Sequence, residues 1–252
     1  MRRAALALGL LLLAGCHPRA PSQAAENVRI TAEPVTLTAA DGVKIAGVYT
    51  GVDAPKALIL LFHQAESSKD EYALIAPRLA SQGYASLRID QRAGGSLFGI
   101  NETVRKLGPS DDFLAAKQDL EAAYAWASAR KLPLVLWGSS YSASLAIVLA
   151  AEHPGLAGVL AFSPGEYFPD PHTLTKAAAR VQAPLFVTSA QDGKEIDAAR
   201  AALDASPATR KIQFVPKLGG VHGSATLLRA RNPQGAEAAW SSVLAFLHDI
   251  AP

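Results

Sequence analysis

Apolar positions along the chain fall into two patterns. Short runs that are mostly apolar throughout predict strands buried on both faces, at residues 57–62, 84–89, 134–137, 156–162, 184–189 and 211–215. Longer stretches carry apolar residues at helical spacing and predict helices at residues 72–82, 111–130, 143–151, 174–180, 198–203 and 236–250. Ser110 is the candidate N-cap of the 111–130 helix because Asp111 and Asp112 follow it.

Residues 28–50 show a different pattern from the rest of the chain. Residues 28–38 and 43–50 alternate apolar and polar positions around Asp41-Gly42, which predicts an antiparallel hairpin at a sheet edge. Beyond it strands alternate with helices, which is typical of an α/β fold with a mostly parallel central sheet covered on both faces. In such sheets the functional site lies beyond the carboxyl ends of the strands.

One of these strand ends contains a serine in a distinctive setting. The apolar run 134–137 leads into Gly138-Ser139-Ser140-Tyr141-Ser142, and a predicted helix follows directly. A strand, a sharp turn around a serine and a helix form the context in which a Gly-x-Ser-x-Gly-like motif is meaningful. Such a turn requires small residues on both sides, and Gly138 and Ser142 flank Ser140, with Ser142 in place of the usual glycine.

Four other strand ends also offer candidate chemistry. They contribute His63-Gln64, Asp90-Gln91-Arg92 with Gly94, Gly95 and Ser96, then Asp192, and finally the glycine-rich loop around His222. A serine, a carboxylate and a histidine in this chain order resemble the arrangement of the α/β-hydrolases. The chain is most similar to the small members grouped with the dienelactone hydrolases, over essentially all of its length after residue 27. The resemblance implies the α/β-hydrolase fold and acyl-transfer chemistry.

The roles follow from what the chemistry needs. A serine hydroxyl is a poor nucleophile at neutral pH, so Ser140 requires a base, for which His222 is the candidate, and Asp192 would orient the imidazole. The backbone N–H groups of Tyr141 and Gln64 are the expected oxyanion donors. His63-Gln64 resembles the His-Gly start of the corresponding loop in the family, with glutamine in place of glycine.

Alternatives remain for each position. Ser139 and Ser142 compete with Ser140, and Asp192 could instead cap the helix that follows it, which leaves Asp197 as the second candidate acid. Among the other histidines only His63 lies at a strand end, where it fits support of the loop better than general base. Asp90 and Arg92 resemble an Asp-x-Arg-Gly segment of the family, and we expect an ion-paired turn that shapes the wall of the site beside His63.

The N-terminus reads as a targeting segment. Arg2 and Arg3 precede an apolar stretch too short to span a membrane, and Leu13-Ala14-Gly15-Cys16 resembles the lipobox of bacterial lipoproteins. That resemblance implies cleavage before Cys16, the chain's only cysteine, and lipid attachment there; the alternative is an ordinary secretory leader. His17 follows the cysteine instead of the aspartate associated with inner-membrane retention, which favours an outer-membrane location facing the periplasm.

These segments define the expected organisation. Residues 1–15 form the signal peptide, residues 16–27 an acylated cysteine and flexible tether, and residues 28–252 one α/β-hydrolase domain. Loss of Arg2 and Arg3 from the 24 Lys and Arg leaves a number equal to the 22 Asp and Glu. This balance gives no support for nucleic-acid binding. No cofactor or metal is implied, because the chain has no His/Cys cluster with ligand spacing and no phosphate-binding glycine loop.

Only about 21 residues separate residue 162 from residue 184, too few for a cap domain. Residues 163–171 and 97–109 would then wall an open site suited to a small or exposed acyl substrate. The favoured hypothesis is a lipid-anchored serine hydrolase of the cell envelope that acts on a carboxylic ester. A peptidase or thioesterase with the same triad, or a non-catalytic envelope binding module, are the alternatives. The sequence leaves the oligomeric state open.

Overall fold

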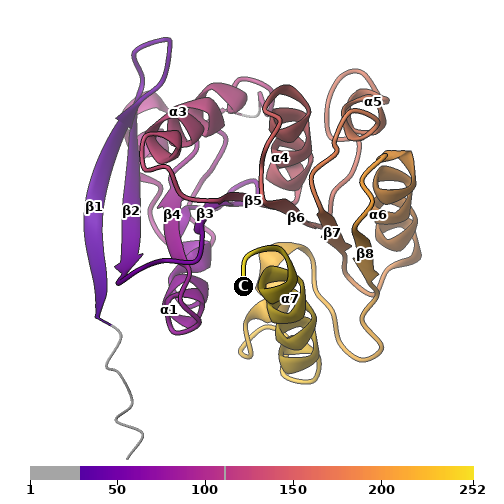
Figure 1. Ribbon diagram of the computed structural model, residues 1–252. Helices are drawn as coiled ribbons and strands as arrows, with labels where there is room; N and C mark the ends of the chain where they lie inside the picture. The colour runs from indigo at the N-terminus through magenta and orange to yellow at the C-terminus, as the bar shows by residue number, and fades with distance from the viewer. Residues whose placement is uncertain (1–28, 111) are drawn as a thin grey trace, which may run out of the picture.

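A single eight-stranded sheet organises the protein (Figure 1). The computed structural model describes residues 29–110 and 112–252. Across the sheet the strand order is β1-β2-β4-β3-β5-β6-β7-β8. The strands are β1 (Ile30–Thr38), β2 (Lys44–Val52), β3 (Leu58–Phe62), β4 (Ala85–Ile89), β5 (Leu134–Ser139), β6 (Gly158–Phe162), β7 (Leu185–Thr188) and β8 (Lys211–Phe214). The α/β class predicted from the apolar pattern is confirmed.

An antiparallel hairpin forms one edge of the sheet. β1 pairs with β2 from Ile30↔Val52 to Thr38↔Lys44, and β2 then pairs antiparallel with β4. The remaining neighbours pair in parallel. The carboxyl ends of the six parallel strands therefore meet at one edge of the sheet, where the polar residues of the sequence are brought together.

Each face of the sheet carries its own apolar core because successive strand residues point to opposite faces. Within β3, Leu58, Leu60 and Phe62 belong to one core, whereas Ile59 and Leu61 belong to the other. The first core is covered by α3 (Lys117–Ser128), α4 (Tyr141–Glu152), α5 (Thr173–Ala178) and α6 (Gly193–Ala205). The second is covered by α1 (Ile75–Ala80) and α7 (Ala236–Ile250), below the sheet in Figure 1.

Helices differ from the expectation in several places; α6, for example, begins at Gly193 and not at residue 198. The predicted helix at 72–82 divides into the 3₁₀ turn η1 (Lys69–Tyr72) and the shorter α1. The long helix expected from residue 111 begins only at Lys117, and Ser110 instead accepts a hydrogen bond from the Asp112 N–H. In the segment expected to be loop, α2 (Glu102–Leu107) forms, capped by the Asn101 side chain, which accepts from the Val104 N–H.

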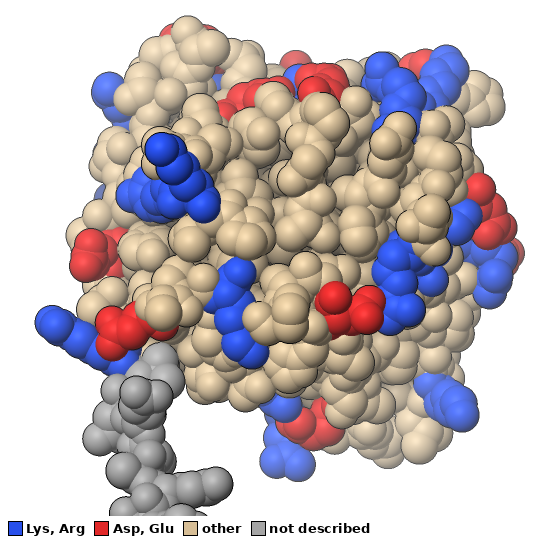
Figure 2. Space-filling view, viewed as in Figure 1, with Lys and Arg blue, Asp and Glu red and all other residues tan. Residues whose placement is uncertain are grey.

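The surface carries charges of both signs. On the face shown in Figure 2, lysines and arginines lie interspersed with aspartates and glutamates. Within residues 29–110 and 112–252, no helix is long and apolar enough to cross a membrane. Between β6 and β7 the chain forms only α5 and its loops, and the last connection before α7 contains the 3₁₀ turn η2 (Gly223–Leu227).

The junction of β5 and α4 is packed at backbone contact. A side chain on Gly138 would overlap the Ser142 carbonyl, so this position requires glycine. Ser142 occupies the place of the usual glycine and is fully buried. Its Oγ lies 2.7 Å from the Phe62 carbonyl oxygen and accepts from the Ser139 N–H at 3.1 Å. The hydroxyl therefore ties the turn to the end of β3.

Replacing Ser142 should weaken the fold measurably. In Ser142→Ala the buried Ser139 N–H loses its acceptor, which is expected to cost about 1–3 kcal/mol of unfolding free energy. Urea unfolding followed by circular dichroism measures this. Ser128→Ala is the control, because the exposed Ser128 hydroxyl bonds only to the Tyr124 carbonyl of its own helix. Equal stability of the two variants would contradict the role assigned to Ser142.

Candidate active site

Ser140 lies in a strained turn between β5 and α4. Its backbone has φ 59° and ψ −127°, a conformation that costs a non-glycine residue about 1–3 kcal/mol. The turn is held in place because the Ser140 N–H donates to the Phe162 carbonyl at 2.8 Å. Its competitors are engaged elsewhere, since the Ser139 hydroxyl donates to Glu71 and the Ser142 hydroxyl ties the turn to β3. Ser140, expected from the motif, is the serine in the strained position.

His222 is paired with a carboxylate, and that carboxylate is Glu195. The His222 Nδ1 and the Glu195 Oε1 lie 2.8 Å apart. Partial burial works to raise the pKa of Glu195, but hydrogen bonds from His222, from the Ala190 N–H and from Ser163 outweigh it and lower this pKa to about 2. An ionised carboxylate can only accept, so Nδ1 donates to it, and in the neutral imidazole Nε2 is then the nitrogen that has the lone pair.

The expected contact between Asp192 and His222 is wrong. Asp192 is the N-cap of α6, and its side chain accepts from the N–H groups of Lys194 and Glu195 at 3.0 and 3.2 Å. The carboxylate is therefore held against the start of its own helix. Glu195, on the first turn, points instead to His222, and its other oxygen accepts from the Ala190 N–H at 3.0 Å.

The loop that carries His222 is docked onto the serine turn. The Ser224 N–H donates to the Ser139 Oγ at 2.9 Å, and the Gly223 N–H donates to the Ser163 Oγ at 3.0 Å. Gly223 has φ 68°, and a side chain there would overlap the Ser139 hydroxyl. Residues adjacent to Ser140 and His222 are thus in direct contact, although among the described residues no hydrogen bond joins the two side chains themselves.

Of the two expected oxyanion donors, only one is available. Tyr141 begins α4, and its N–H has no acceptor within the described part of the chain. The Gln64 N–H donates to the Glu71 Oε2 at 2.9 Å, so its expected role is wrong in this conformation. The next N–H along the loop, that of Ala65, has no acceptor in residues 29–110 and 112–252.

Glu71 is a buried carboxylate behind this loop. Besides Gln64 it accepts from the Ser139 hydroxyl at 2.6 Å and contacts the Ser67 hydroxyl at 3.4 Å. Burial raises the pKa of Glu71 to about 7, although the hydrogen bonds from Ser139, Gln64 and Ser67 and the nearby His222 act to lower it. The chain thus keeps a titratable group beneath the serine turn.

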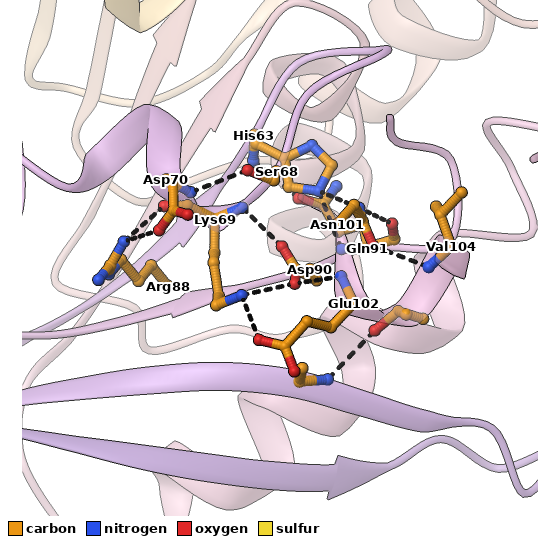
Figure 3. A network of polar contacts seen from close by, with 12 residues as sticks. His63, Ser68, Lys69, Asp70, Arg88, Asp90, Gln91, Asn101, Glu102 and Val104 are labelled. Carbon is orange, nitrogen blue, oxygen red and sulfur yellow. Dashed lines mark hydrogen bonds and ion pairs between the residues drawn. The ribbon is translucent and has the colours of Figure 1, made fainter. Parts of the chain in front are cut away.

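His63 supports the same loop, and Figure 3 shows its ring beside Gln91 and Asn101. Its Nδ1 donates to the Gln64 carbonyl at 2.7 Å, and its Nε2 accepts from the Gln91 N–H at 2.9 Å. Burial lowers the pKa of His63 to about 4, despite the raising influence of Gln64 and Asp90. Both ring nitrogens are occupied, so His63 has no free lone pair for a general base, in agreement with its expected supporting role.

His63, Asp90 and Arg92 lie behind the wall of the site. His63 and Asp90 are fully buried, and Asp90 accepts from the Lys69 ammonium at 2.8 Å, as Figure 3 shows. Arg92 forms ion pairs with Asp41 and Asp119. The expected ion-paired turn is present, but its partners come from other elements, and these side chains hold loops in place instead of lining the site.

A pocket of about 310 Å³ opens beside His222. It is lined by Gln64, Leu97, Phe98, Val221, His222, Ala225 and Arg231. On another side, Tyr167 lies against Ser140; burial raises the pKa of Tyr167, and the contact with Ser140 acts to lower it. Segments 97–109 and 163–171 therefore both contribute residues near the catalytic candidates, as expected.

No group of three or more histidine, cysteine or carboxylate side chains in residues 29–110 and 112–252 could hold a metal ion. Cys16, the expected lipidation site, lies outside the described residues.

The protein-family comparison agrees with this geometry. A family model described as serine aminopeptidase, S33 (Hydrolase_4), matches residues 53–219, more than half of the chain. The chain belongs to this family. The protein is therefore a hydrolase of the α/β type, as the order of serine, carboxylate and histidine suggested. No curated protein matches the chain in sequence.

Solved structures of related hydrolases share the fold. Dienelactone hydrolase from Anabaena variabilis superposes with a TM-score of 0.69 at 18% identity, covering 88% of this chain and 99% of that one. An esterase from Pyrococcus furiosus gives 0.68 at 19% identity, covering 88% and 94%. The acylaminoacyl peptidase of Pyrococcus horikoshii gives 0.66 at 12% identity, covering 88% of this chain and 42% of the longer one. At these identities the likeness concerns the fold.

Two side chains of this S33 hydrolase were missed by the sequence analysis. For Glu195 the sequence carries a partial signal, because Asp192-Gly193-Lys194-Glu195 has the spacing of a capping box, which assigns Asp192 to the helix start. A capping box would pair the glutamate with the N–H of its own cap residue, whereas in the structure Glu195 contacts the Ala190 N–H and His222. Glu71 carries no comparable signal, because only the fold brings it to Ser139.

His63 should make the protein sensitive to acid. Its pKa falls from 6.5 to about 4 on folding, so the stability it contributes is present above pH 6.5 and is lost as the pH falls towards 4. At 1.36 kcal/mol per unit the loss amounts to about 3 kcal/mol. Urea unfolding at about pH 7 and about pH 4 should show a smaller pH effect in His63→Gln than in wild type, since Glu71 is common to both. The exposed His172→Gln is the control, and an equal effect in both variants would contradict the assignment.

Proposed function

We propose that the protein is a serine hydrolase that cleaves a small or exposed carboxylic ester with Ser140 as nucleophile, His222 as general base and Glu195 as the acid that orients His222. The single observation that carries the proposal is the His222–Glu195 pair on a loop docked against the strained Ser140 turn. Glu195 replaces Asp192 in the proposal because Asp192 is committed to capping α6.

The reaction follows from the protonation states. Ser140 Oγ attacks the acyl carbon while its proton passes to His222 Nε2, the nitrogen left free by the Nδ1–Glu195 bond. Collapse of the oxyanion expels the alcohol, which takes the proton from His222. Water then attacks the acyl-enzyme with His222 again as base, which releases the carboxylic acid and restores Ser140.

The oxyanion needs two N–H donors. We assign them to Tyr141, which follows the nucleophile at the start of α4, and to Ala65. Ala65 is preferred to Gln64 because the Gln64 N–H already donates to Glu71. Ala65 is also partly exposed and lines a pocket of about 430 Å³ with Glu66, Phe113 and neighbouring residues.

A matched pair of variants tests the choice of acid. Residues 27–252 are labelled with a fluorophosphonate probe, and the modified peptide is mapped. Labelling at Ser140 should disappear in Ser140→Ala and fall sharply in His222→Ala. Glu195→Gln should lower the labelling rate about 100-fold or more, because the imidazole loses its orienting partner. Asp192→Asn should retain it, because asparagine caps helices as well as aspartate does.

If Asp192→Asn lowered the labelling rate and Glu195→Gln did not, the residue that orients His222 would be Asp192. Absence of labelling in a folded wild-type protein would favour the non-catalytic binding module. The family description names a serine aminopeptidase, so ester substrates are compared with aminoacyl amides of the same acyl group. Preference for the amide would replace the esterase proposal by a peptidase, and preference for acyl thioesters would indicate a thioesterase.

We also propose that the full chain is a bacterial lipoprotein anchored through Cys16, in the outer membrane facing the periplasm. The support is the sequence alone: a basic start, a short apolar stretch and Leu13-Ala14-Gly15-Cys16.

Radiolabelled palmitate fed to bacteria that express the full chain should be incorporated, and Cys16→Ala should abolish incorporation. Membrane separation should place the wild-type chain in the outer membrane and His17→Asp in the inner membrane. Secretion without label would indicate an ordinary leader and would contradict the anchor.

A further inference from the structure

A buried carboxylate joins the three segments that carry the proposed chemistry. Glu71 Oε2 accepts from the Gln64 N–H at 2.9 Å, in the loop after β3, and Glu71 Oε1 accepts from the Ser139 hydroxyl at 2.6 Å, one residue before the nucleophile. The same Ser139 oxygen accepts from the Ser224 N–H at 2.9 Å, two residues after His222. We propose that Glu71 is a positioning residue for the reaction, an inference that rests on the proposed function.

Burial of a carboxylate is unfavourable in free energy, which indicates that Glu71 has a role beyond packing. Only 1% of its surface is exposed, and within residues 29–110 and 112–252 no lysine or arginine forms an ion pair with it. A buried carboxylate without a cation is unfavourable unless hydrogen bonds satisfy it. Here the satisfying donors are one backbone N–H and two hydroxyls from the segments to be aligned.

The donor and acceptor pattern favours the ionised form. Ser139 donates its hydroxyl proton to Glu71 and uses its lone pairs to accept from Ser224. A protonated Glu71 has less acceptor capacity for the three donors around it, because one of its oxygens then carries a proton of its own. Protonation therefore weakens the contacts through which Glu71 holds Ser139, the residue that also binds the His222 loop.

Titratable groups from three elements face Glu71. They are Tyr72 in η1, Tyr141 in α4 and His222 in the loop after β8. Burial raises the pKa of both tyrosines well above the ordinary value, so they are neutral at the pH of the reaction. His222 is thus the group whose charge changes during turnover, and an ionised Glu71 favours the imidazolium that forms in the transition state.

From these contacts of Glu71 we expect its substitution to change kcat. Loss of the charge and of one hydrogen bond in Glu71→Gln should lower kcat about tenfold to 100-fold with little change in KM, because the contacts act on the catalytic groups and not on the substrate. The pH profile should change as well. In wild type, protonation of Glu71 contributes to the acid limb of log(kcat/KM), so the slope of this limb should be steeper than in Glu71→Gln, which lacks that group.

Stability separates this effect from misfolding. Because the pKa of Glu71 rises from 4.5 to about 7 on folding, its charge makes the folded protein less stable as the pH rises through this range. Glu71→Gln is therefore expected to unfold at a temperature no lower than wild type at about pH 8. Glu237→Gln is the matched control, since the exposed Glu237 pairs with Arg78 on the surface and should leave kcat and the slope unchanged.

The experiment measures hydrolysis of a nitrophenyl ester and fluorophosphonate labelling of Ser140 across pH for wild type, Glu71→Gln, Ser139→Ala and the double variant. The two substitutions interrupt one network, so their effects on kcat should be clearly less than additive. Additive effects, an unchanged kcat in Glu71→Gln, or a lower kcat with an unchanged slope would overturn the inference. A wild-type protein that is neither labelled nor active would overturn the proposed function, and the inference with it.

Discussion

The strained backbone at Ser140 is the constraint on which the site depends. A residue with φ 59° between a strand and a helix is stable only if its surroundings fix it from several sides. Gly138 allows α4 to approach β5 at backbone contact, the Ser142 hydroxyl ties the turn to β3, and the Ser140 N–H is held by β6. The sheet supplies all three supports, so Ser140 is positioned by the core of the fold instead of by a loop.

Behind this turn the protein places polar groups in two networks that meet at Gln64. One holds the loops after β3 and β4 through His63, Asp90 and Lys69, and it is satisfied with a neutral histidine and an ion pair. The other centres on Glu71 and joins the serine turn to the His222 loop. They shift the pKa of their central groups in opposite directions, because burial disfavours the imidazolium of His63 and the carboxylate of Glu71 alike.

Sequence patterns predicted the sheet well and the ends of helices less well. Strands such as β3 and β5 are apolar throughout because both faces are buried, and that signal is local. α2 was missed because it lacks an apolar stripe, although Asn101 and Glu102 at its start and Gly108 at its end mark a short helix. Ser140 and His222 were predicted from their places at strand ends, and the structure brings their two segments into contact. The partner of His222 was not predicted, since Asp192 and Glu195 are separated by less than one helical turn and only the helix start decides which of them faces the loop.

The first turn of α6 carries both the residue that caps the helix, Asp192, and the carboxylate that contacts His222, Glu195. Successive residues of a helix are rotated by about 100°, so the direction of the carboxylate is set by how far Glu195 lies from the capped end at Asp192. Insertions before Asp192 would lengthen a loop and leave this angle intact. A single residue added between Asp192 and Glu195 would turn the carboxylate away from His222 while leaving the cap in place. In this chain the contact with His222 therefore tolerates a change of length before the cap but not between the cap and Glu195.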